Sequence, residues 1–223
     1  KLEGAEARLT IVGNEAIATI SERVKNAHRR RFAIAHELGH FEMHRDKKEL
    51  FIDKHLRPWI TPRYRFEREA NEFDSAFLMP RKYFALECYH ETPSLEFMDK
   101  LSHKFNASLT ATSLRFLKFT NQPVSLIFSS EKREVKWRHY SGAFKKLGLS
   151  IPKGFKPSMR TETANTFDSV RRIRKVPIAE WFDISQLDNE ITSIKEQAWL
   201  LGGKNKFILT LLWIEEPLIE GTM

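Results

Sequence analysis

The chain has 223 residues, of which 41% are apolar and 30% are charged, and this composition excludes a disordered protein. Such a length can bury one core or two small ones. The only cysteine, Cys88, excludes an intramolecular disulfide, and the longest apolar run, 207–214, is far shorter than the roughly 20 residues that a membrane helix needs. Because no secretory leader precedes the first charged stretch, we expect a cytoplasmic protein.

The formal net charge of +8 is compatible with a nucleic-acid surface, an acidic protein partner or high solubility. Basic residues gather in three clusters, at 29–31, at 132–133 and at 171–175. None of these clusters has the aromatic residues of a platform for single-stranded nucleic acid. We therefore interpret them as solvated faces.

The chain opens with two β-rich runs, Leu9–Ile11 and Ile17–Thr19, which predict a hairpin that turns at Gly13-Asn14. Helical spacing of apolar residues then predicts a helix over 27–44. A second helix is predicted to begin at Thr61-Pro62, where threonine can act as N-cap, and to end before Pro80. Its predicted buried stripe consists of Phe66, Ala70, Phe73 and Phe77.

Two short helices are predicted between Ser94 and Thr120, with a turn near 106–108. The pattern then changes to strands, with one more helix expected near 184–198. The predicted strands are 124–128, 135–140 and 207–214. We therefore predict an α+β fold in three sections: a core at 1–86, a helical section at 87–122 and a C-terminal α+β domain at 123–223.

The strongest chemical signal is the stretch His36-Glu37-Leu38-Gly39-His40 in the first predicted helix. Residues four apart share a helix face, so His36 and His40 can bind one metal ion through their imidazoles. Zinc suits these ligands and, in catalytic sites, keeps one of its four positions for water. Glu37 lies beside the first ligand and can act as the general base of a peptidase.

The alternative is a chance match on a surface helix. Two features favour a metal site: the five residues lie in an apolar helix, and Gly39 costs that helix roughly 1 kcal/mol relative to alanine. Such a glycine predicts close packing against a neighbouring element.

A third protein ligand is needed. Some zinc peptidases place a glycine three residues after the second histidine and a ligand three residues further on, positions held here by Met43 and Asp46. Without that glycine, the helix has no reason to turn Asp46 back toward the ion. His44 shares the face of His40 but lies one turn further along, and we interpret it as an exposed histidine at the helix end.

The second predicted helix offers a better source of the third ligand. Glu67, Asn71 and Asp74 lie on one polar face beside its phenylalanine stripe. Glu69 competes with Glu67, because helical phase does not separate them. Asn71 lies one turn after Glu67 and can hydrogen-bond a ligand as an outer partner, which favours Glu67.

Three stretches resemble the ImmA/IrrE family of metallopeptidases: 31–40 (RFAIAHELGH), 67–73 (EREANEF) and 77–80 (FLMP). The resemblance implies a zincin-like, gluzincin-like core in which His36, His40 and Glu67 bind zinc. It also implies that Glu37 is the catalytic glutamate. Asp74 stands where the family usually has a small residue. Manganese is an alternative to zinc.

Residues 101–108 and the helix after them are similar to the helical section that comes after the core in this family, and they have a helix-turn-helix look. The second helix offers only Arg115 and Lys118 as long cations. The hypothesis that this section packs against the site and supports it is therefore at least as good as the hypothesis that it binds DNA. The C-terminal domain resembles the variable region of the family only in its position.

The resemblance also implies a substrate, because members of this kind cleave helix-turn-helix repressors in stress or mobile-element responses. An extended peptide could pair with the edge of the N-terminal hairpin. Tyr64, Tyr83 and His103 are candidate oxyanion donors by residue type alone. The rival hypothesis is a DNA-binding or protein-interaction regulator, or a toxin–antitoxin partner, that retains the zinc site without cleaving.

Overall fold

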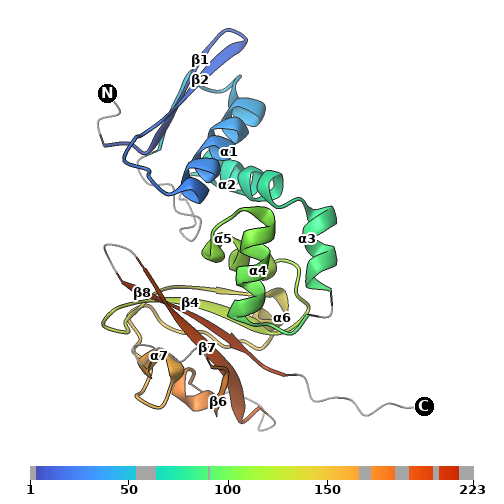
Figure 1. Ribbon diagram of the computed structural model, residues 1–223, viewed down its shortest axis with the longest axis vertical. Coiled ribbons are helices and arrows are strands. Elements are labelled where there is room, and N and C mark those ends of the chain that lie inside the picture. The colour runs from blue at the N-terminus through green and yellow to red at the C-terminus, as the bar shows by residue number, and fades with distance from the viewer. Residues whose placement is uncertain are drawn as a thin grey trace, which may run out of the picture. The chain divides into compact units, whose positions relative to one another are not determined.

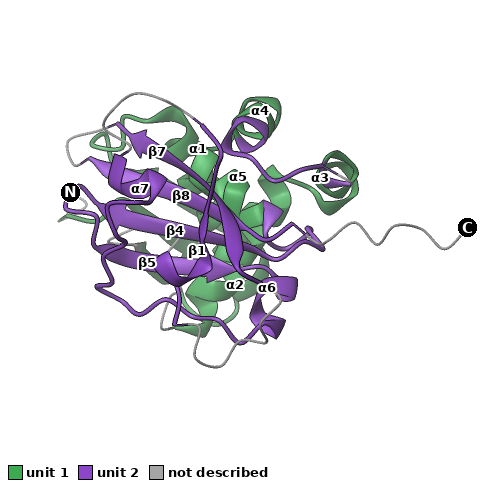
Figure 2. Ribbon diagram, turned by 90° about the horizontal axis from the view of Figure 1, so that it is seen from below, with its two compact units in different colours: residues 1–87, 99–115 green, residues 88–98, 116–223 purple. Residues whose placement is uncertain are grey.

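The chain has a mixed α+β fold, as the sequence predicts. The computed structural model describes residues 4–53, 64–89, 91–165, 172–183, 191–202 and 206–215. The chain divides into two compact units, unit 1 with residues 1–87 and 99–115 and unit 2 with residues 88–98 and 116–223 (Figures 1 and 2). Within the described ranges, none of the helices has the length and apolar character that a membrane span requires.

Unit 1 contains a three-stranded antiparallel sheet in the order β2-β1-β3, made of β1 (Ala7–Val12), β2 (Glu15–Ile20) and β3 (Leu50–Asp53). The predicted hairpin is confirmed, and its turn uses Gly13 at a φ of +61°, a value that glycine adopts without strain. Strand β3 was not predicted, because its four residues are too few for a clear period of two. Ala7, Leu9 and Ile11 face the core and are buried.

Helix α1 (Ala27–His44) has the predicted bounds, and Asn26 caps it by accepting a hydrogen bond from the backbone N–H of Arg29 at 3.0 Å. Helix α2 (Arg65–Leu78) begins after an extended Tyr64. The predicted helix start at Thr61-Pro62 lies outside the described residues. A further helix, α3 (Arg81–Cys88), begins directly after Pro80 and was not predicted.

Helices α1 and α2 pack closely at Gly39, which confirms the close packing that this glycine predicts. A Cβ added there would lie 3.1–3.2 Å from side-chain atoms of Phe73 on α2. The predicted buried stripe of α2 is wrong at its end, because Phe77 is 57% exposed. Leu78 makes the contact with Phe32 and its neighbours instead.

Helices α4 (Leu95–Phe105) and α5 (Leu109–Phe116) confirm the predicted pair and its turn. Asn106 adopts a left-handed φ of 48°, which asparagine tolerates, and ends α4. The hydroxyl of Ser108 accepts a hydrogen bond from the N–H of Ala111 at 3.2 Å and so caps α5. The section predicted at 87–122 contributes to both units, since α4 begins in unit 2 and ends in unit 1.

Unit 2 is built on a five-stranded antiparallel sheet in the order β5-β4-β8-β7-β6. Its strands are β4 (Val124–Ser130), β5 (Val135–Tyr140), β6 (Arg174–Pro177), β7 (Ser193–Leu201) and β8 (Phe207–Trp213). The three predicted strands are therefore confirmed. The shorter elements are α6 (Gly142–Lys146), α7 (Glu162–Asn165) and the 3₁₀ helix η2 (Ile178–Glu180). One face of the sheet carries a core that includes Ile127, Phe144, Val176, Trp181, Ile194 and Leu212.

The helix predicted near 184–198 is wrong where the structure describes it. Residues 193–201 form strand β7, which pairs with β6 on one side and β8 on the other, and residues 184–190 lie outside the described ranges. Pairing on both edges overrides the helix-favouring composition around Glu196 and Ala198.

Candidate metal centre

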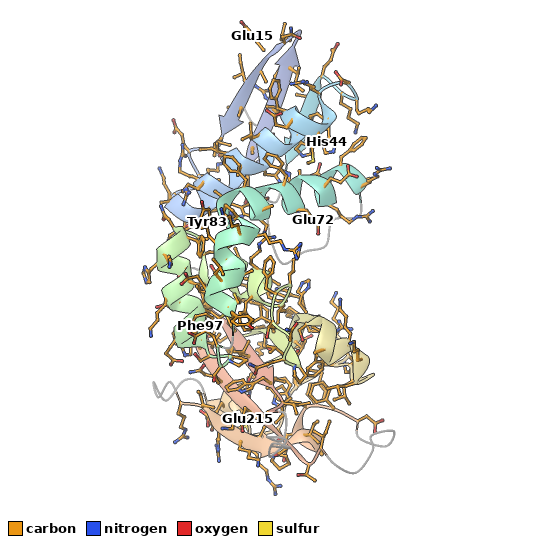
Figure 3. All side chains as sticks on the ribbon, turned by 90° about the vertical axis from the view of Figure 1, so that its right-hand side faces the viewer. Glu15, His44, Glu72, Tyr83, Phe97 and Glu215 are labelled. Carbon is orange, nitrogen blue, oxygen red and sulfur yellow. The ribbon has the colours of Figure 1, made fainter. Side chains whose placement is uncertain are left out.

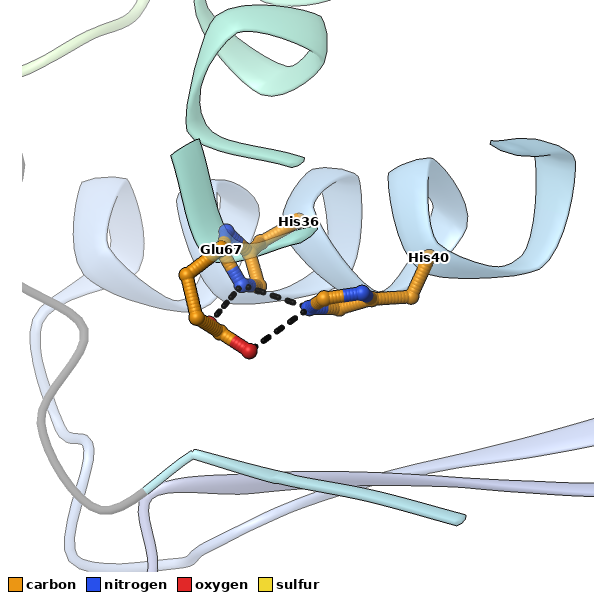
Figure 4. A group of neighbouring side chains, drawn as sticks. All are labelled: His36, His40 and Glu67. Atoms are coloured by element: carbon orange, nitrogen blue, oxygen red, sulfur yellow. Dashed lines mark hydrogen bonds and ion pairs between the residues drawn. The ribbon is translucent and has the colours of Figure 1, made fainter. Parts of the chain in front are cut away.

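Two helices of unit 1 bring three metal-binding side chains together (Figure 4). His36 and His40 lie one turn apart on α1, and Glu67 comes from the first turn of α2. The two histidines are fully buried. In the described residues, the structure thus unites His36, His40 and Glu67, the ligand set that the family resemblance implied.

The spacing of the ligand atoms suits one small ion. Nε2 of His36 lies 3.1 Å from Nε2 of His40, and the carboxylate oxygens of Glu67 lie 3.2 Å from the first nitrogen and 3.5 Å from the second. Four ligands held tetrahedrally at zinc bond lengths of about 2.0–2.1 Å lie about 3.3–3.4 Å from one another. The observed distances match that separation.

Asp74 on α2 determines which nitrogen of His36 carries the proton. Its Oδ2 lies 3.4 Å from Nδ1 of His36, and both side chains are fully buried. A carboxylate can only accept, so Nδ1 donates and Nε2 keeps its lone pair. That lone pair points toward Nε2 of His40 and the Glu67 carboxylate, so electron-rich atoms converge where a cation would relieve their repulsion.

Burial keeps His40 in the neutral form that a metal needs. Desolvation lowers the pKa of His40, although the carboxylate of Glu67, as a hydrogen-bond acceptor, acts in the opposite direction. The ring of Phe51 on β3 stacks on the His40 ring at 4.2 Å and closes one side of the site. The donor atoms, their charge and their apolar surroundings therefore fit a bound metal ion.

The structure places the other predicted residues less directly. Glu37 is fully buried beside His36 in the chain. Asn71 is half-buried on α2, and the carboxylate that reaches His36 belongs to Asp74. The sequence put Asp74 on the same polar face as Glu67 without giving it a role. The signal was its spacing of seven residues, two helical turns, from Glu67.

His44 corrects a sequence-based interpretation. We interpreted it as an exposed histidine at the helix end, but the residue is only 2% exposed. It lies at the C-terminal end of α1, where Figure 3 labels it. Its Nδ1 lies 3.1 Å from Nδ1 of His40, and its Nε2 lies 2.9 Å from the carboxylate of Glu69. Glu69, the competitor of Glu67, therefore contacts His44.

Comparison with known proteins agrees with this geometry. The family model of the M78 peptidases, described as the IrrE N-terminal-like domain, matches residues 14–117. This range contains α1, α2 and the three candidate ligands. No curated protein matches the chain. Since the match covers the two helices that carry the candidate ligands and continues through α5, the chain carries a metallopeptidase domain of the ImmA/IrrE family.

Proposed function

We propose that this protein is a zinc-dependent endopeptidase that cleaves one or a few peptide bonds in a transcriptional repressor. The observation that carries the proposal is the convergence of His36, His40 and Glu67 at the ligand spacing of zinc, with Glu37 next to the first ligand. Manganese can bind the same ligands, but two imidazoles and one carboxylate at tetrahedral spacing favour zinc.

Zinc, when bound by His36, His40 and Glu67, would supply a Lewis acid that polarises the scissile carbonyl and makes water more acidic. Glu37 would accept a proton from the attacking water and pass it to the leaving amine. Asp74 would hold His36 in the tautomer that exposes Nε2. The burial of Glu37 keeps this proton transfer away from bulk water.

An extended substrate would bind along a strand edge. The sequence suggested the edge of the N-terminal hairpin, and the free edge of that hairpin is β2. Strand β3 forms the opposite edge of the sheet and carries Phe51, which stacks on the ligand His40. We therefore place the substrate on β3, where main-chain hydrogen bonds would bind it with little side-chain selection.

A repressor substrate is the expectation from the family, and one contact in unit 1 weakens the DNA-binding rival. Arg115, one of the two long cations that the sequence offers at the second helix of the helical section, is 7% exposed. Its Nε donates to the carbonyl oxygen of Met79 at 3.2 Å, so its guanidinium braces α5 against the end of α2. Phosphate binding by this segment would rest on Lys118.

The test compares zinc-loaded wild type with Glu37→Gln in native cell lysate by mass spectrometry of newly formed protein N-termini. One or a few cuts inside a repressor, found only with the wild type, support the proposal. Identical N-termini in both samples, with zinc bound in both, would favour the non-cleaving regulator. Cuts across many unfolded proteins would indicate a degradative peptidase instead.

A further inference from the structure

We infer that His44 and Glu69 are positioning residues for the metal ligand His40, holding its ring in the tautomer and orientation that direct Nε2 at the metal. The inference rests on the proposed metal site and deepens it, because it explains how the second histidine is prepared for binding. It also gives a role to two residues that contribute no ligand atom to the cluster.

A continuous chain of contacts leads from the metal site to the surface of α2. Nδ1 of His40 meets Nδ1 of His44 at 3.1 Å, Nε2 of His44 meets Oε2 of Glu69 at 2.9 Å, and Oε1 of Glu69 accepts from Nε of Arg65 at 2.7 Å. Of these four side chains, both histidines are buried. Glu69 is partly exposed and Arg65 is largely exposed.

Aromatic packing holds His44 in place between the two helices. Its ring lies 4.7 Å from the ring of Phe66 on α2, 6.1 Å from Phe51 on β3 and 5.2 Å from the His40 ring. Three neighbouring rings thus restrict the χ angles of His44. Its two ring nitrogens face His40 and Glu69. A freely rotating histidine at a helix end could not fix its neighbour in this way.

The proton positions depend on the acceptor at the end of the chain of contacts. Oε1 of Glu69 accepts from the Arg65 guanidinium at 2.7 Å, and a carboxylate paired with a guanidinium can only accept hydrogen bonds. Nε2 of His44 must therefore donate, which makes Nδ1 of a neutral His44 an acceptor. Nδ1 of His40 then donates to it, and Nε2 of His40 keeps the lone pair that binds metal.

Both candidate ligand histidines are thus held in the tautomer that carries its proton on Nδ1, but through different contacts. His36 donates directly to Asp74, while His40 donates through His44 to Glu69. Both carboxylates lie on α2, the helix that also provides Glu67. The position of α2 against α1 therefore determines all three ligand groups together.

The experiment measures zinc and cobalt dissociation constants by competition with a chromophoric chelator, for the full chain and four variants. His44→Phe keeps the aromatic packing but removes the acceptor from His40, so affinity should fall about 10- to 100-fold. His44→Asn can place an amide oxygen near the former Nδ1 and should restore part of that loss. Glu69→Gln keeps the shape of the side chain without its charge and should weaken binding less than His44→Phe. Glu42→Gln, an exposed change on α1, is the matched control.

The absorption spectrum of the cobalt-loaded protein provides a second readout, because it changes when a ligand ring turns. If His44→Phe and Glu69→Gln bind metal as tightly as the wild type with the same spectrum, the inference is wrong while the metal site stands. If the wild type binds no metal, the proposed function itself fails. Should His44→Phe not fold, Glu69→Gln still decides, since its side chain is partly exposed and its replacement keeps the same size.

Discussion

Both units contain fully buried carboxylates, but these carboxylates have different kinds of hydrogen-bond partner. In unit 2, the Glu196 carboxylate accepts from the N–H of Thr163 at 2.8 Å, the hydroxyl of Thr163 at 2.7 Å and the N–H of Glu162 at 3.0 Å. These donors fasten α7 to strand β7. In unit 1, Asp74 contacts Nδ1 of His36, and Nε2 of the same ring faces the carboxylate of Glu67. A buried acid supplied with donors has a structural role, whereas acceptors that converge on one point favour a bound cation.

The largest effect is expected from removing the ligand that α2 provides. Glu67→Ala should lower zinc affinity by more than the about 10- to 100-fold that outer partners contribute. Unit 2 should be unaffected. Tryptophan fluorescence in a Trp59→Phe background can check this, because the other four tryptophans, Trp137, Trp181, Trp199 and Trp213, belong to unit 2. Chelator competition measures the affinity. Unchanged zinc binding would show that the metal binds elsewhere. The carboxylates of unit 1 would then not differ in role from those of unit 2.

A smaller loss is expected at the acid that orients His36. Asp74→Ala should lower zinc affinity about 10- to 100-fold, because Nδ1 of His36 loses its acceptor. Asp74→Asn keeps an amide oxygen at the same place and should lose less. Equal affinities for the alanine variant and the wild type would mean that Asp74 is merely a buried acid, like Glu196.

Gly39→Ala should have a still smaller effect on the metal site. A methyl group there would press on Phe73 at 3.1–3.2 Å, and overpacking costs about 1–3 kcal/mol against a helix-propensity gain of about 1 kcal/mol. We expect lower stability by urea unfolding and weaker zinc binding as α2 moves. Gly142→Ala in α6 is the control, since nothing lies within 4 Å of its added Cβ. A stabilised Gly39→Ala with full zinc affinity would contradict the close packing.

Glu196→Gln should leave zinc affinity unchanged. It should lower stability at every pH, because its NH2 group would face donors that the carboxylate now accepts from, and it should remove the pH dependence that this carboxyl group contributes. Burial raises the pKa of Glu196 in the folded state above the ordinary value of 4.5. The folded state therefore holds this proton more tightly than the unfolded chain does. The resulting stability is present below about pH 4.5 and is lost as pH rises through the folded pKa. Relative to the variant, the wild type should lose unfolding free energy as pH rises above 4.5 and through the raised pKa of Glu196 in the folded state.

Glu134→Gln should change the pH dependence of stability in the opposite direction. Lys136 lowers the pKa of Glu134, so the wild type should gain stability relative to this variant as pH rises. The effect should be small, because the pair is exposed. Urea unfolding at several pH values measures both differences. A pH-independent difference for Glu196→Gln would mean that its carboxyl group has the same pKa in the folded and unfolded states.

Local patterns in the sequence were enough to predict much of unit 1. The turn at Gly13-Asn14, the bounds of α1 and the shared face of His36 and His40 depend on residues a few positions apart. The motif also pointed to metal chemistry, because its spacing is itself the geometry of the site. These features needed no knowledge of what packs against α1.

Only the tertiary structure decided between residues that the sequence treats alike. Glu67 and Glu69 each flank the buried stripe of α2, but the first contacts the candidate ligand histidines of α1 and the second contacts His44. His44 became buried because Phe66 on α2 and Phe51 on β3 pack over it. Strand β7 formed where composition favoured a helix. In each case the deciding contact comes from an element distant in the chain, and local spacing carries no information about such partners.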